Sequence, residues 1–382
     1  MNNCTIHIIN DLKRGGSTKA CFRTISYLNL KAKVIILDKR EIDKDYDLQQ
    51  NNIDFYSLDW SSTKNFKESF FDIFSLLQKE NDSIINCWLY KSIMFGTLMS
   101  IFCKNNKLIW HIRHEDVRFD IRNFKKFLLI RTLALISLIK FKKIYLIYNS
   151  KKALESHSRI GFQTKNNFVI NNGFDTNKFK HDDNLKEKFL NKFKIKKGIF
   201  LISMYARFHP IKNHLIFFKA IENILSRNNN IHIFLAGRYI YYSNYKLIRL
   251  IKNHGLSKNI TLGGMLSEED LIGSYSATDL TVLTSTSESF PNVIGESMSC
   301  STPCLSFDVG DCNKIIGSSG WIVRNNNLND LVSGIENAIE INSCKEEWNK
   351  IKRDSRKNIY NLYNESLEKR KYLETFDQIF RG

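Results

Sequence analysis

The chain has 382 residues, which favours two domains because single hydrophobic cores seldom grow beyond about 250–300 residues. A hydrophobic fraction of 43% can supply two cores, and three prolines with seventeen glycines exclude a fibrous or low-complexity chain. The net charge of +18 predicts an anionic partner such as a phosphorylated substrate, a nucleic acid or an anionic membrane surface.

The eight cysteines are scattered, and no pair has the spacing of a zinc site. They are typical of free thiols in a reducing cytoplasm. The start of the chain lacks the apolar stretch of a signal peptide. The longest apolar run, 127-FLLIRTLALISLI-139, is shorter than the roughly 20 residues of a spanning helix. We therefore expect a cytoplasmic protein that does not cross the membrane.

Strand and helix patterns alternate along the first half of the chain. Strands are predicted at 4–10, 32–38, 82–89, 107–114, 143–150 and 166–174. Helices are predicted at 11–30 and 66–80. This alternation is typical of a mostly parallel sheet that is covered by helices on both faces.

A second copy of the pattern follows a charged segment at 174–188, which we interpret as a linker. Strands are predicted at 198–207, 231–237, 259–264, 279–286 and 302–308. Helices are predicted at 214–227, 245–255, 267–278 and along the charged tail from residue 345. No short-period repeat occurs, so the sequence predicts two doubly wound α/β domains and excludes a solenoid.

Two features at strand ends could bind an anion. Gly15 and Gly16 lie between a strand and a helix, where glycines let backbone N–H groups approach a phosphate, although a tight turn also uses them. Arg207 ends the first strand of the second half, and Lys212 follows it. Two cations at such a place can hold a diphosphate, or they can be solvated surface charges.

Two carboxylates stand where a strand meets a helix, in 287-SESFPNVIGESMSCSTP-303. Seven residues separate Glu288 from Glu296, and Pro291 suits the start of the helix. Carboxylates accept hydrogen bonds from neighbouring hydroxyls, so the pair could grip the two sugars of a nucleotide-sugar. Acidic residues also favour helix N-termini for electrostatic reasons, so the spacing alone leaves both interpretations open.

The segment 288–311 resembles the donor-site signature of the family 4 retaining glycosyltransferases, which have the GT-B fold. The family pattern contains two glutamates with seven residues between them, an internal Phe-Pro-Asn and a later Val-Gly-Asp turn. The matching positions are Glu288, Phe290, Pro291, Asn292, Glu296, Pro303, Val309, Gly310 and Asp311. Ser301 stands where the family commonly has glycine. Other family features occur in order along nearly the whole chain.

The resemblance implies two Rossmann-like domains that face each other across a cleft. An acceptor domain is expected at 1–175 and a donor domain at 176–359, with a helix at 360–382 that packs back on the first domain. The implied reaction transfers a hexose-type sugar from a nucleotide-diphosphate donor, UDP or GDP, with retention of the anomeric configuration. Neither a metal nor another cofactor is expected, since cations and helix ends stabilise the phosphates.

The resemblance also implies roles for single residues. Glu288 would bind hydroxyls of the donor sugar and Glu296 the ribose, while Arg207 and Lys212 would stabilise the leaving diphosphate. Further donor contacts are expected from Gly15, Gly16, Arg238, Phe290, Asn292 and Val293.

One strand end departs from the family. The family often has a histidine there, close to the reacting sugar, whereas this chain reads 109-IWHIRHED-116. Arg113 and His114 are therefore the expected catalytic candidates, and His111 is a third group whose direction the sequence leaves open.

Basic residues surround the apolar run at 127–139. Residues 121–150 contain no Asp or Glu and seven cations, namely Arg122, Lys125, Lys126, Arg131, Lys140, Lys142 and Lys143. Such a helix can lie on an anionic bilayer, or it can be a domain helix with solvated basic ends. The first interpretation fits a lipid-linked oligosaccharide acceptor in O-antigen, capsule or lipopolysaccharide biosynthesis.

Other functions remain open at this stage. A sugar-nucleotide epimerase or a phosphorylase could use the same fold. A basic α/β protein could also bind nucleic acid, but no helix-turn-helix or RNP pattern occurs, so nucleic acid is not an expected partner.

Overall fold

The structure is a computed structural model. It describes residues 4–12, 15–38, 52–80, 83–103, 107–115, 124–138, 143–163, 165–227, 230–324 and 326–381. The chain forms two compact units. Unit 1 comprises residues 1–172 and 368–382, and unit 2 comprises residues 173–367.

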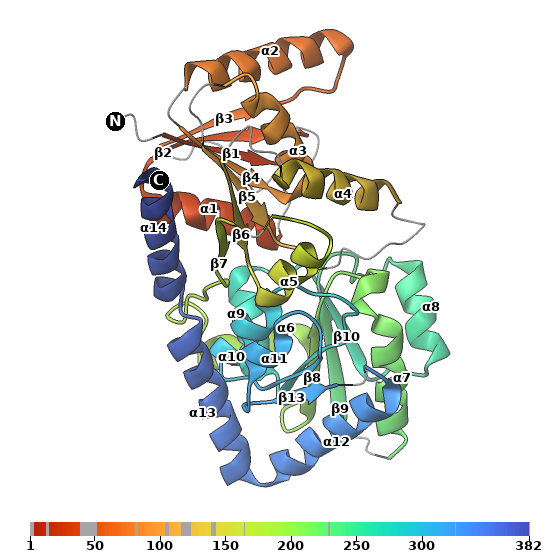
Figure 1. The fold of residues 1–382 in the computed structure, drawn as a ribbon. Coiled ribbons are helices and arrows are strands. Elements are labelled where there is room, and N and C mark those ends of the chain that lie inside the picture. The colour runs from red at the N-terminus through yellow and green to blue at the C-terminus, as the bar shows by residue number, and fades with distance from the viewer. Residues whose placement is uncertain are drawn as a thin grey trace. The chain divides into compact units, whose positions relative to one another are not determined.

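Unit 1 contains a seven-stranded parallel sheet in the order β3-β2-β1-β4-β5-β6-β7 (Figure 1). Its strands are β1 (Cys4–Ile9), β2 (Lys31–Ile36), β3 (Ile53–Ser57), β4 (Ile84–Trp88), β5 (Lys107–Ile112), β6 (Ile144–Tyr148) and β7 (Asn167–Val169). Its helices are α1 (Gly16–Leu28), α2 (Thr63–Lys79), α3 (Leu89–Ser100), α4 (Phe124–Leu138) and α5 (Lys151–Arg159). All residues of β1, β4 and β6 are buried, as expected for parallel strands with helices on both faces.

Unit 2 contains a six-stranded parallel sheet in the order β10-β9-β8-β11-β12-β13. Its strands are β8 (Phe200–Tyr205), β9 (Ile231–Ala236), β10 (Ile260–Gly264), β11 (Leu280–Leu283), β12 (Cys304–Phe307) and β13 (Trp321–Val323). Its α-helices are α6 (Asp183–Phe193), α7 (His214–Leu225), α8 (Tyr245–Asn253), α9 (Glu268–Ala277), α10 (Asn292–Ser299), α11 (Cys312–Ile316), α12 (Leu328–Ser343) and α13 (Lys345–Leu362). A 3₁₀ turn, η3, spans Pro210–Lys212.

The strand order reverses beside the first strand of each sheet, between β1 and β4 and between β8 and β11. Open parallel sheets bind ligands at the carboxyl ends of the strands next to such a point. Gly15 and Gly16 follow β1, Arg207 follows β8, and Glu288 follows β11. The topology therefore brings the residues singled out in the sequence to the expected edge of each sheet, and it confirms the predicted pair of doubly wound domains.

The last helix, α14 (Glu365–Arg381), packs on unit 1 (Figure 1). Tyr372, Phe376 and Ile379 are buried in a cluster with side chains of β4, β5 and β6. The Lys107 ammonium donates to the carbonyl oxygen of Ile379 at 2.6 Å. The helix before it, α13, is bound to unit 2 by Arg356, which donates to the carbonyl oxygens of Thr176, Phe179 and Ser299.

The segment interpreted as a linker, 174–188, already contains the start of α6. Asp182 caps this helix by accepting the N–H of Leu185 at 2.9 Å. Gly273 of α9 lets the two helices approach, since a Cβ there would lie 2.5 Å from the carbonyl oxygen of Leu185. Some of the charges that suggested a linker precede α6, and the others belong to this helix, whose Phe189 and Leu190 are buried.

Helix α4 includes most of the predicted apolar run. Arg122, Lys140 and Lys142 lie outside the described residues. Of the helices in the described part of the chain, none combines the length and the hydropathy that are needed to cross a bilayer.

Candidate functional site

The loops after β8 and β11 are bonded to each other in unit 2. The Thr284 hydroxyl donates to the carbonyl oxygens of Lys212 at 3.1 Å and Asn213 at 3.3 Å. The Lys212 ammonium forms an ion pair with the Glu288 carboxylate, and these side chains are 21% and 14% exposed. The structure thus joins two residues that the sequence predicted for one site, at the sheet edge where a ligand is expected.

Arg207 and Arg238 lie on adjoining loops. Arg207 is exposed, and the N–H of its neighbour Phe208 donates to the carbonyl oxygen of Arg238 at 2.9 Å. Gly237 has φ 140°, and a Cβ there would lie 2.5 Å from the carbonyl oxygen of Ala206. Glycine is therefore required for the turn that brings the two arginines together.

The Val-Gly-Asp turn supports the backbone of Glu288. Gly310 has φ 55°, and a Cβ there would lie 2.5 Å from the carbonyl oxygen of Glu288. The N–H of Asp311 donates to the carbonyl oxygen of Ser289 at 3.0 Å. This close contact of backbone with backbone explains why the turn needs glycine.

Helix α10 begins at Asn292, and Pro291 is its N-cap residue. The side chain of Phe290 is 6% exposed and packs in the core of unit 2, against the rings of Phe174 and Tyr363. Gly295 lets Phe174 reach the helix, because a Cβ there would lie 2.1 Å from that ring. Phe290 therefore anchors the loop before α10 by packing. Asn292 and Val293 lie in the first turn, where backbone dipoles favour an anion.

Glu296, on α10, accepts a hydrogen bond from the Tyr275 hydroxyl at 3.0 Å. Tyr275 belongs to α9 and is 1% exposed. Burial and the nearby Glu296 carboxylate raise the pKa of this phenol well above its ordinary value, so it remains a neutral donor. Sequence reasoning missed Tyr275, since a tyrosine on the apolar face of a helix looks like any other core residue.

The first turn of α1 carries the two glycines of unit 1. Gly15 is the N-cap residue, both glycines are exposed, and no acidic side chain stands in the first turn. The partial positive charge of this helix start is thus not balanced by a carboxylate of that turn, which suits an approaching anion.

The three groups at the end of β5 differ in how far they are buried. His111 is fully buried, lies 3.7 Å from the Trp88 ring in a stacked pair and is hydrogen-bonded to Asn86 at 3.0 Å. Burial lowers its pKa well below the ordinary range, so it is a neutral core residue. His114 is exposed and Arg113 is half-buried, with a hydrogen bond to the Asn172 side chain. These two remain as candidates for contact with a ligand.

No cluster of three or more His, Cys, Asp or Glu side chains suited to a metal ion occurs among the residues that the structure describes.

Known proteins resemble this chain in part of its sequence and in its fold. Residues 186–358, within unit 2, match the family described as "Glycosyl transferases group 1". The solved structure of HepE from Anabaena in complex with UDP and glucose superposes with a TM-score of 0.82 and 17% identity, covering 98% of this chain and 100% of that one. WaaG, described as a glycosyltransferase involved in lipopolysaccharide biosynthesis, has a TM-score of 0.73 and 12% identity, covering 96% and 98%. These likenesses confirm the GT-B fold.

Two curated relatives match parts of the chain. The UDP-Gal:alpha-D-GlcNAc-diphosphoundecaprenol alpha-1,3-galactosyltransferase of Escherichia coli is 27% identical over 206 residues, which cover 51% of this chain and 50% of that protein. The D-inositol 3-phosphate glycosyltransferase of Rhodococcus erythropolis is 25% identical over 150 residues, covering 37% and 34%. The chain therefore spans half or less of the length of these relatives. The match of residues 186–358 to the group 1 glycosyltransferases agrees with the family that the sequence motif predicted.

Proposed function

We propose that the protein transfers a hexose-type sugar from a nucleotide-diphosphate donor to a saccharide acceptor, with retention of the anomeric configuration. The observation that carries the proposal is the Lys212–Glu288 ion pair at the carboxyl edge of the second sheet. Eight positions further along, Glu296 is held by the buried Tyr275 hydroxyl. A cation that can neutralise a departing phosphate thus stands beside one carboxylate that can bind hydroxyls, and a second such carboxylate follows on α10.

In this proposal each site residue of unit 2 has one role. Lys212 and Arg207 stabilise the negative charge that develops on the diphosphate as the glycosidic bond breaks. Glu288 accepts hydrogen bonds from the transferred sugar, and Glu296 accepts them from the ribose. The start of α10 contributes its dipole to the phosphates, through the amides of Asn292 and Val293. Arg238 is proposed to contact the nucleobase.

The proposal also assigns roles in donor binding and transfer to residues of unit 1. The start of α1, at Gly15 and Gly16, would bind a phosphate or sugar oxygen. Arg113 and His114 are proposed to act at the transferred sugar. We propose UDP as the nucleotide, because the donor named for the Escherichia coli relative is UDP-Gal and HepE was solved with UDP.

A donor screen tests the function. Purified protein is incubated with UDP-, GDP- and dTDP-sugars and a membrane lipid extract, and the release of free nucleotide diphosphate is measured. We expect release from one donor and a loss of about a hundredfold or more in Glu288→Gln. Glu187→Gln is the matched control, because it removes a carboxylate from the surface ion pair with Lys197 in the same unit. No release from any donor would contradict the proposal.

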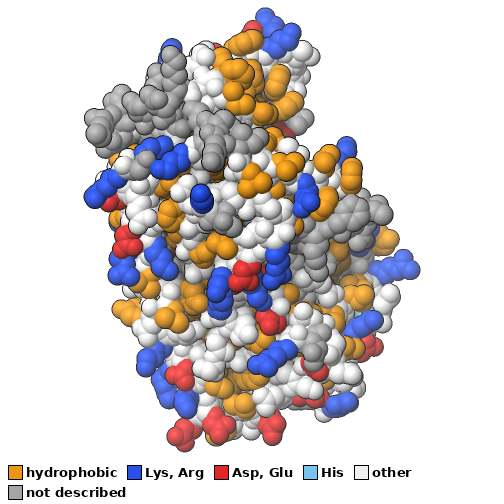
Figure 2. Space-filling view, in the orientation of Figure 1, with side chains coloured by type: hydrophobic (Ala, Val, Ile, Leu, Met, Phe, Trp, Pro, Cys, Tyr) orange, Lys and Arg blue, Asp and Glu red, His pale blue; other side chains and the backbone are white. Residues whose placement is uncertain are grey.

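The acceptor is proposed to be a lipid-linked saccharide at an anionic membrane. Helix α4 has exposed apolar side chains at Phe124, Leu128, Leu135 and Leu138, and it carries Lys125, Lys126 and Arg131. Leu98, Ile101 and Phe102 of α3 and the turn after it, and Phe71 of α2, are also exposed. Figure 2 shows hydrophobic side chains gathered over the part of unit 1 that α2 occupies in Figure 1. Apolar side chains beside cations favour binding to an anionic bilayer.

Flotation with liposomes tests the membrane contact. Wild-type protein is expected to float with vesicles that contain phosphatidylglycerol, and less with vesicles of phosphatidylcholine alone. Leu135→Glu, at a side chain that is 66% exposed, should weaken binding. Leu362→Glu, at a side chain of α13 that is 58% exposed, is the control and should not. Equal flotation of all three proteins would contradict this part of the proposal.

A further inference from the structure

Arg113 lies at the carboxyl edge of the first sheet on a rigid support. It follows β5 directly, and its guanidinium lies over the Trp88 ring, 6.0 Å from the ring centroid. Trp88 is stacked on His111 on β5, and its indole N–H donates to His7 at 3.2 Å. Because all three of these aromatic side chains are fully buried, the surface beneath Arg113 has little freedom to move.

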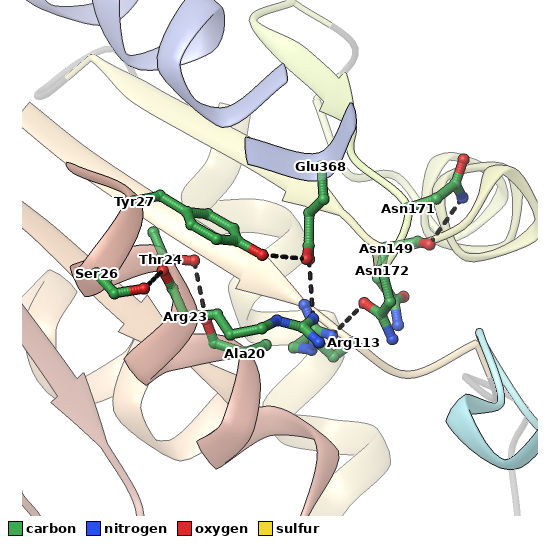
Figure 3. Close-up of polar contacts among 10 residues, drawn as sticks. All are labelled: Ala20, Arg23, Thr24, Ser26, Tyr27, Arg113, Asn149, Asn171, Asn172 and Glu368. Carbon is green, nitrogen blue, oxygen red and sulfur yellow. Dashed lines mark hydrogen bonds and ion pairs between the residues drawn. The ribbon is translucent and has the colours of Figure 1, made fainter. Parts of the chain in front are cut away.

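Asn172 binds the guanidinium directly, and the buried Glu368 carboxylate attracts it through its charge. Arg113 donates to the side-chain oxygen of Asn172, which is 2% exposed (Figure 3). Glu368 of α14, which is 3% exposed, accepts hydrogen bonds from Arg23 and Tyr27, each at 2.9 Å. Burial lowers the pKa of Arg113, whereas Tyr372 and the Glu368 carboxylate oppose that shift. Two arginines thus share the charge of one buried carboxylate, so Arg113 keeps positive charge for an incoming anion.

Asn172 and Glu368 lie at the boundaries between the two units in the chain. Asn172 is the last residue of unit 1 before the chain enters unit 2, and Glu368 is the first residue of unit 1 after the chain returns. Asn172, which binds Arg113, and Glu368, which attracts it, therefore stand at the two points at which the chain passes between the units.

We propose that Glu368 and Asn172 are positioning residues, which set the Arg113 guanidinium at the place where it acts on the donor. This inference rests on the proposed function, in which Arg113 acts at the transferred sugar. A group displaced by about 1 Å from its productive position can lose about a hundredfold in rate. The helix that carries Glu368 would thus contribute to turnover as well as to the packing of unit 1.

A double-mutant cycle tests this proposal. Transfer is measured for wild type, Glu368→Gln, Arg113→Gln and the double variant, with kcat and KM determined separately and Tm recorded. We expect Glu368→Gln to lower kcat by about tenfold or more with a smaller change in the donor KM. In the Arg113→Gln background the same change should lower kcat little further, because Glu368 is proposed to act through Arg113, which that variant lacks.

Glu80→Gln is the matched control. It makes the same chemical change in a half-buried ion pair of unit 1, where Glu80 lies 2.5 Å from Lys33. It should lower Tm and leave kcat within about threefold of wild type. Multiplicative losses in the double variant, or a Glu368→Gln protein with wild-type kcat, would overturn the inference while the transferase function stands. A wild-type protein without transfer from any donor would overturn both.

Discussion

At the scale of single residues, Glu296 depends on a phenol that comes from another helix. Tyr275→Phe removes the hydrogen bond at 3.0 Å and keeps the ring that packs in the core. Because a hydrogen bond to a charged group contributes about 1.5–3 kcal/mol, we expect the donor KM to rise by about tenfold or more. Steady-state kinetics check this, and a smaller change in kcat is expected since Glu296 is assigned to the ribose. An unchanged KM would contradict the role given to Glu296.

Ser301 shows why glycine is common at its position in the family. Its φ is 63°, in the left-handed region, directly after α10. The N–H of Thr302 donates to the carbonyl oxygen of Ser297, and that of Ser301 to Met298, which is the pattern of a helix C-terminus that favours glycine. Ser301→Gly should raise the free energy of unfolding by about 0.5–1 kcal/mol, as measured by urea denaturation. A lower midpoint in urea would contradict this account.

At the scale of elements, the loop before α10 that carries Glu288 and the Val-Gly-Asp turn are packed backbone against backbone. Gly310→Ala would put a Cβ 2.5 Å from the carbonyl oxygen of Glu288 and force a side chain into φ 55°. The backbone of Glu288 has to shift, so we expect kcat to fall by about tenfold or more along with a loss of about 1–3 kcal/mol in stability.

Gly317→Ala is a suitable control for this change. Gly317 also has positive φ, at 57°, but the nearest atom to its Cβ would be 3.7 Å away. It should lose stability and retain activity. Equal losses of activity in the two variants would show that strain alone, and not contact with Glu288, causes the effect.

At the scale of the whole molecule, buried histidines make stability depend on pH. Burial lowers the pKa of His7 to about 3 and those of His157 and His214 to about 4, from 6.5. The unfolded chain therefore binds more protons than the folded chain below pH 6.5. The free energy of unfolding is therefore highest above that pH. It falls as the pH is lowered towards 4, because protons bind the unfolded imidazoles first.

We expect the free energy of unfolding to fall by about 1–2 kcal/mol for each histidine between pH 7.5 and pH 5. Tm should fall over the same range. His7 and His157 lie in unit 1 and His214 in unit 2, so amide hydrogen exchange should show earlier loss of protection in unit 1. The single variant His157→Gln, at the hydrogen bond with Tyr90, should reduce the pH dependence. A Tm that is constant over this range would contradict the assignment of neutral buried imidazoles.

The sequence by itself determined the class of fold and most of the donor motif. Short apolar strands alternate with amphipathic helices, and this local pattern is enough to predict two parallel sheets. The spacing from Glu288 to Glu296 is also local, because it depends on one strand end and the helix that follows. Gly310 could be matched to the family from the sequence. The reason that glycine is needed there, its close approach to the carbonyl oxygen of Glu288, is seen only in the folded chain.

Only the tertiary structure decided which side chains meet across long separations of sequence. Glu288 contacts Lys212 because β8 and β11 are neighbours in the sheet, and Glu296 of α10 contacts Tyr275 of α9 although 20 residues separate them in the sequence. The structure also showed that His111 is fully buried whereas Arg113 is only half-buried, a difference that the sequence could not show because residues two apart share one side of a strand. The position of Glu368 beside Arg23 and Arg113 depends on the return of the last helix to unit 1. Such contacts arise from burial of whole faces of helices and strands, so no local pattern records them.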